Sequence, residues 1–171
     1  AQTSNLSMVN SMQSMNASLK SLLAQMQSAN FITQASSIGH SPLVSGNTIA
    51  YDGQSSVVAL GASVANPLTA ATALVSDEKG NQITNIKLGA LNAGMKNFVW
   101  NGRDANGNQM PAGNYRVSIS GTTSSGVNEN PTAYVAAPVM TVSKATNGSD
   151  VMLNLLDGRS INANDVIQWV S

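Results

Sequence analysis

Apolar residues at the start of the chain recur with a helical period. Residues 1–38 contain no glycine or proline, and Lys20 is their one charged residue. The apolar positions are separated alternately by four and three residues, which places them along one side of a helix. These positions are Met8, Met12, Met15, Leu19, Leu22, Met26 and Ala29. The pattern predicts an N-terminal helix over residues 1–38 with a possible coiled-coil seam, because such seams repeat every ~3.5 residues.

Two interpretations of this helix stay open. Methionine is a flexible core residue, and serine and asparagine are mediocre helix formers, so the isolated helix would be marginal in water. Either the helix packs on its own domain or frays, or self-association or a partner protein completes it. The self-association hypothesis assigns the contact to Met8, Met12, Met15, Leu19, Leu22 and Met26.

Beyond Gly39 and Pro42, which end the helical region, the apolar pattern changes to a period of two. Tyr115, Val117 and Ile119 alternate with polar residues, as in a half-buried antiparallel strand. Residues 77–81 form a turn signal between two further apolar runs. Short strands with regular turn signals predict a β-sandwich over residues 54–121.

The rest of the chain predicts a second, smaller β-module. Residues 122–130 are polar and glycine-containing and predict a linker. Residues 131–171 then carry three or four short strands, with turn signals at 147–148 and 157–158 and with Trp169 expected in the core. This stretch suits a small barrel that lacks one strand. Residues 41–53 could supply that strand, which would make the barrel discontinuous and the sandwich an insertion.

The stretch WNGRDANGNQMPAGNY (residues 100–115) raises the question of a binding site. Asp104, Asn106 and Asn108 alternate as calcium ligands do, but Gly107 is misplaced for an EF-hand loop and no glutamate follows at its twelfth position. Asparagine, aspartate and glycine are also the residues that form tight turns. We therefore expect two structural turns here, and no metal.

The composition of the chain gives no support for a catalytic or cofactor-binding site outside residues 100–115. Only 9% of the 171 residues are charged, the formal net charge is zero and there is no cysteine. Nucleic acid and anionic membranes are therefore poor partners, and no apolar run is long enough to insert into a membrane. His40 is the single histidine, and no nucleophile elbow, phosphate loop or dinucleotide fingerprint is present. We expect no catalytic residue and no cofactor.

The same stretch resembles the Ig-like module of the bacterial flagellar hook-capping protein family, also called basal-body rod modification proteins. That pattern is roughly W-x-G-x-D-x-x-G-x-x-x-P-x-G-x-Y. The matching positions are Trp100, Gly102, Asp104, Gly107, Pro111, Gly113 and Tyr115. Residues 26–39 are similar to the segment that joins the helix to the first strand in this family. The order of helix, lone strand, inserted module and returning strands also agrees.

The resemblance implies a mostly β fold, in which an Ig-like or fibronectin-III-like β-sandwich is inserted into a small Tudor-like β-barrel after an N-terminal α-helix. It also implies a non-enzymatic scaffold that sits at the extracellular tip of the growing hook, as a ring-like and plausibly pentameric homo-oligomer, and promotes polymerisation of the hook protein. Export by the flagellar type III apparatus without a cleaved signal is implied too, through an N-terminal segment that precedes this sequence.

Two rival classes remain at this point. One is an Ig-like adhesion or sorting module of another secreted bacterial protein, because related modules occur in such proteins. The other is a carbohydrate-binding module. That class needs exposed aromatic side chains, and aromatic residues make up only 4% of this chain.

Overall fold

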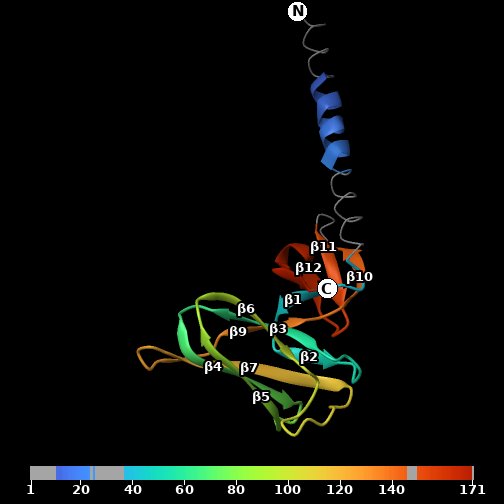
Figure 1. Cartoon of the computed structure of the whole chain (residues 1–171). Coiled ribbons are helices and arrows are strands. Elements are labelled where there is room, and N and C mark those ends of the chain that lie inside the picture. Colours follow the sequence, from blue (N-terminus) through green and yellow to red (C-terminus); the bar gives the residue numbers. More distant parts are fainter. Residues whose placement is uncertain (1–10, 24, 26–36, 146–149, 171) are drawn as a thin grey trace, which may run out of the picture.

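The computed structural model describes residues 11–23, 25, 37–145 and 150–170. Within this part of the chain, residues 11–23 form a helix, and most residues after residue 40 lie in antiparallel strands joined by turns and loops. Figure 1 shows the helix standing apart from the strands, which gather into two β-modules. This arrangement confirms the predicted mostly β fold with an N-terminal helix.

Two sheets face each other in the larger module. The first has the strand order β13-β1-β9-β3-β6, and the second has the order β2-β7-β4-β5, with β8 attached to β7. The strands of the first sheet are β1 (Ser41–Ser45), β3 (Val58–Val64), β6 (Gly94–Trp100), β9 (Thr132–Ala136) and β13 (Gln168–Val170). Those of the second are β2 (Thr48–Tyr51), β4 (Leu68–Asp77), β5 (Gln82–Leu91), β7 (Gly113–Thr123) and β8 (Asn128–Glu129).

Alternating apolar residues from both sheets fill the space between them. In β7, Tyr115, Val117 and Ile119 point inward and are buried, as the period of two predicts. They meet Leu60 of β3 and Val75 of β4 in one continuous cluster. The predicted β-sandwich is therefore present, and its core is built from side chains of both sheets.

A second, smaller cluster lies beside the sandwich. The strands β10 (Val139–Lys144), β11 (Val151–Leu155) and β12 (Ser160–Asn162) form a three-stranded sheet, followed by the short 3-10 helix η1 (Ala163–Asp165). Its buried residues are Val44 of β1 together with Ala137, Val139, Leu153 and Leu155. The three-stranded sheet and β1 thus enclose a core of their own, in the manner of a half-barrel.

The strand partners differ from the expected domain boundaries in three places. β9, which was expected in the small barrel, pairs with β3 of the sandwich. Residues 41–53 do not act as one strand: β1 pairs with β13 and β9, whereas β2 pairs with β7 of the sandwich. Residues 122–130 are not an extended linker, because β7 continues to Thr123 and its partner β8 returns along it. Periodicity identifies strands but not their partners, since any strand of matching pattern can pair.

The expectation that Trp169 lies in the core of the small barrel is wrong. Its side chain is 40% exposed. The reason is that β13 is the outermost strand of the first sheet, paired only with β1, with Trp169 opposite Pro42. Side chains stand out from the two faces of a sheet, and on an edge strand they have side-chain neighbours of their own sheet on one flank only.

Candidate functional site

Three aromatic rings form the centre of the stretch that the sequence singled out. Trp100 at the end of β6 is only 1% exposed, and its ring centroid lies 5.0 Å from that of Tyr115 and 5.1 Å from that of Tyr51. The rings of Tyr51 and Tyr115 meet edge to face. Aromatic pairs favour such tilted contacts. This cluster anchors the motif in the sandwich core.

The polar ends of these rings hold the turns in place. The indole N–H of Trp100 donates to the carbonyl of Arg103 at 2.9 Å, and the hydroxyl of Tyr115 donates to the carbonyl of Pro111 at 2.8 Å. Burial raises the pKa of Tyr115, so its hydroxyl keeps the proton that it donates. Each turn of residues 100–115 is therefore tied to the ring at its own end.

Asp104 organises the first of these turns. One carboxylate oxygen accepts the backbone N–H groups of Asn106 and Asn108, both at 2.8 Å, and the other accepts the side-chain amide of Asn108 at 2.9 Å. The hydrogen bonds from Asn108 are the main reason why the pKa of Asp104 lies below its ordinary value. Arg103 closes the turn by donating to the carbonyl of Gly107 at 2.7 Å. The carboxylate thus has a structural role.

Gly102 is needed for close packing. Its backbone is left-handed, with φ of 68°, and a Cβ there would overlap the hydroxyl of Tyr51. Gly107 has a similar φ of 86°, but nothing lies within 4 Å of the Cβ position. Pro111 and Gly113 complete the path to Tyr115. All seven motif residues therefore lie around one aromatic cluster and its two turns.

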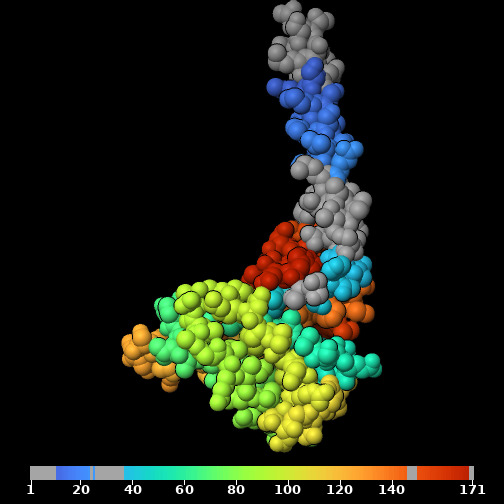
Figure 2. Space-filling view, viewed as in Figure 1, coloured from blue at the N-terminus to red at the C-terminus, as the bar shows by residue number. Residues whose placement is uncertain are grey.

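The seam residues have a different environment. Met12, Met15, Leu19 and Leu22 lie on the described helix, and each is more than half exposed, Leu19 at 51% and Leu22 at 53%. Figure 2 shows this helix projecting from the β-modules. Met8 and Met26 lie outside the described residues. Every residue of 11–23 is exposed, which favours self-association or a partner protein over packing on the chain's own β-modules.

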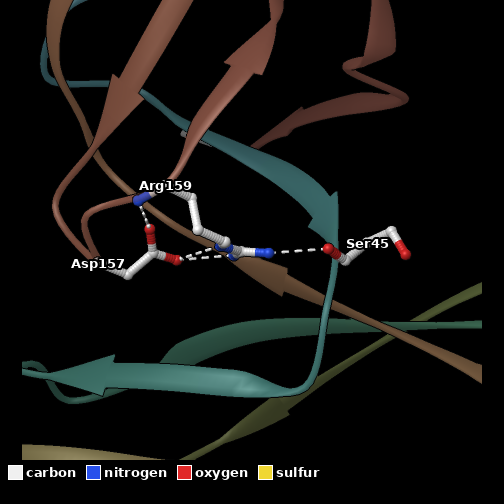
Figure 3. Close-up of polar contacts among 3 residues, drawn as sticks. All are labelled: Ser45, Asp157 and Arg159. Atoms are coloured by element: carbon white, nitrogen blue, oxygen red, sulfur yellow. Dashed lines mark hydrogen bonds and ion pairs between the residues drawn. The ribbon is translucent and has the colours of Figure 1, made fainter.

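Sequence reasoning missed a polar contact at the junction of the two modules. Asp157 and Arg159 form an ion pair at 2.7 Å in the turn between β11 and β12, and the side chain of Asp157 is almost fully buried. The guanidinium also donates to the carbonyl of Ser45 at 2.8 Å, where β1 ends (Figure 3). This contact joins residues 114 positions apart, and no local pattern signals it.

The described residues offer little to chemistry. They contain no group of three or more histidine, cysteine, aspartate or glutamate side chains placed to hold a metal ion. No described helix is long and apolar enough to span a membrane. What stands out in this part of the chain is instead a β-scaffold with two buried clusters and a helix with an uncovered apolar side.

Fold and site together define a class of protein, namely a β-scaffold with an Ig-like module and an exposed helical arm. The model of the FlgD Ig-like domain matches residues 46–125. The chain is 30% identical to the basal-body rod modification protein FlgD of Salmonella typhimurium over an alignment of 167 residues, and the match covers 91% of this chain and 67% of that protein. The chain therefore belongs to the FlgD family.

Solved structures agree with this membership. FlgD of Xanthomonas campestris, whose structure is described in terms of hook capping essential for flagellar assembly, is 28% identical, with a TM-score of 0.64 over 82% of this chain and 99% of that one. FlgD of P. aeruginosa is 26% identical, again with a TM-score of 0.64, over 76% and 96%. The family predicted from residues 100–115 is thus confirmed, and with it a scaffold rather than an enzyme.

Proposed function

We propose that this chain caps the growing flagellar hook as one subunit of a ring-like, pentameric homo-oligomer. Hook capping is the role in which the FlgD of Xanthomonas campestris is described, and family membership extends it to this chain. The cap would sit at the extracellular hook tip, retain hook protein subunits beneath it and be exported by the flagellar type III apparatus. Capping of this kind needs binding surfaces and no chemistry.

The exposed seam is the observation that supports self-association most strongly. An uncovered apolar stripe on a polar helix is costly in water and marks an interaction site when its residues are contiguous. Met12, Met15, Leu19 and Leu22 form such a stripe on the described helix. With Met8 and Met26 the stripe extends over three heptads in the sequence. A short seam associates weakly, and the high local concentration at a hook tip would compensate for this.

The proposal assigns a separate role to the N-terminal helix and to each of the two β-modules. Residues 1–38 would form the arm that assembles the ring. The sandwich of the two facing sheets would be the Ig-like module, and the sheet β10-β11-β12 with β1 the second, smaller module. Two separate buried clusters support two modules. The shared sheet β13-β1-β9-β3-β6 would hold the modules rigidly together while the arm remains free to assemble.

A complementation experiment tests the proposed function. A strain that lacks its own hook-cap protein would receive the full-length protein with Leu19→Gln and Leu22→Gln. We expect the variant to be exported, while hook protein escapes into the medium and no hooks form. The control is Ser14→Gln with Ser21→Gln, two substitutions on the exposed helix away from the seam. Normal hooks with the seam variant would contradict a role of the seam in capping.

A further inference from the structure

A groove of about 430 Å³ opens where the two modules meet. Its walls come from the loop between β2 and β3, the end of β6, the segment between β9 and β10, and the turn after β11. Three of its apolar side chains, those of Val57, Val99 and Leu156, are about half exposed. Apolar side chains that gather in a concave site at a module junction are typical of a binding site.

The groove carries a single charge. Asp52 is the one charged residue among the described residues that line it. Its carboxylate accepts the backbone N–H groups of Gln54 at 2.9 Å and Ser55 at 2.7 Å, and the hydroxyl of Ser55 at 2.8 Å. These hydrogen bonds, that from the Ser55 backbone first, hold the pKa of Asp52 below its ordinary value. The groove therefore presents apolar walls and one fixed negative charge at neutral pH.

The described helix presents complementary features. Lys20 is the one charged residue among residues 11–23 and 25. Leu23 is 57% exposed and lies beside Leu19 and Leu22, although it falls outside the seam. A strict two-stranded coiled coil needs only the narrow seam, whereas a helix laid into a groove needs a wider apolar face. Leu23 gives the helix that wider face, with Lys20 at its flank.

We propose that the groove of one copy receives the turn of Leu19, Leu22 and Leu23 from the helix of a second copy, with Lys20 near Asp52. This inference rests on the proposed self-association and says which surfaces meet. The contact is head-to-tail, because it joins two different surfaces of the same chain. Contacts of this kind close into rings when the rotation between neighbours allows it.

Disulfide trapping tests the contact, since these 171 residues contain no cysteine to interfere. Leu23→Cys protein is mixed with Val57→Cys protein under a mild oxidant, at concentrations where sedimentation shows that the unmodified protein associates. The matched control partner is Val127→Cys, which is as exposed as Val57 (56% and 57%) but lies in the turn between β7 and β8. Docking should raise the mixed-disulfide yield roughly tenfold over this control, because it raises the effective concentration of the two thiols.

The outcomes separate the groove contact from the proposed function. If the unmodified protein stays monomeric even at about millimolar concentration, which matches the effective concentration of tethered sites, while it caps hooks in cells, self-association through these surfaces is overturned. If it associates but the Val57 and Val127 yields are equal, helix pairing survives and groove docking is overturned. Lys20→Glu should lower the Leu23–Val57 yield, since it places two negative charges together. An unchanged yield would overturn the proposed contact between Lys20 and Asp52, and with it the argument that the helix of a second copy occupies the groove.

Discussion

The sandwich core and the N-terminal helix both show regular apolar patterns, yet the apolar side chains are buried in the sandwich and exposed on the helix. Val117 and Ile119 of β7 alternate with polar residues and are covered completely by the facing sheet. Leu19 and Leu22 recur at helical spacing and are more than half exposed. A regular apolar pattern therefore predicts that one face of an element will be buried. Only the structure shows whether the same chain buries that face. The uncovered face is the one available for assembly.

The largest effect should come from removing the centre of the covered region. Trp100→Ala deletes a fully buried ring that contacts both Tyr51 and Tyr115. We expect it to lower the free energy of unfolding by about 3–5 kcal/mol, a large part of the ~5–15 kcal/mol typical of domains. Urea denaturation followed by tyrosine and residual tryptophan fluorescence measures this loss. An unchanged midpoint would mean that the aromatic cluster does not hold the sandwich.

A smaller effect should separate close packing from backbone strain within the motif. Gly107→Ala adds a methyl group in open space, so it should cost only the ~1 kcal/mol of a left-handed backbone. Gly102→Ala has the same strain and also forces a methyl group against the Tyr51 hydroxyl, so about 2–4 kcal/mol is expected. Thermal unfolding of the two variants side by side measures the difference. Equal losses would show that Tyr51 moves freely.

The smallest effect concerns the charge of Asp104. Its folded pKa lies below the ordinary 3.8, so its ionised form stabilises the turn above that value. This stabilisation is lost as the pH falls through the depressed folded pKa. The difference in unfolding midpoint between the unmodified protein and Asp104→Ala should therefore be largest at neutral pH and shrink below about pH 4. Urea titrations between pH 7 and pH 3 measure it, and a difference that grew on acidification would contradict the hydrogen-bond assignment.

Sequence patterns predicted the parts of this molecule that depend on local spacing. The alternation in β7 identified a half-buried strand, and the spacing of Trp100, Gly102, Pro111 and Tyr115 identified the Ig-like motif together with its turns. The turn at residues 77–81 is also present, with Asp77 accepting from Asn81. In each case the residues that decide the structure are near neighbours in the chain.

Features that depend on distant partners were not predictable in this way. The pairing of β2 with β7, the exposure of Trp169 and the contact of Arg159 with Ser45 all depend on which strands become neighbours. Leu23 was overlooked because it interrupts the strict seam, although its place beside Leu19 on the helix could have signalled a wider apolar face. Alternation and heptad spacing carry no information about partner choice, so these features required the folded structure.

Sedimentation equilibrium of the double variant Leu19→Gln and Leu22→Gln decides whether the exposed helix face drives assembly. Urea unfolding of the same sample shows whether the β-modules stay folded. The double variant Ser14→Gln and Ser21→Gln is the control. Because both leucines are exposed in the single chain, we expect an unchanged unfolding midpoint and a loss of self-association that the control does not show. Unfolded β-modules in the double variant, or self-association equal to that of the control, would contradict a seam that serves assembly alone.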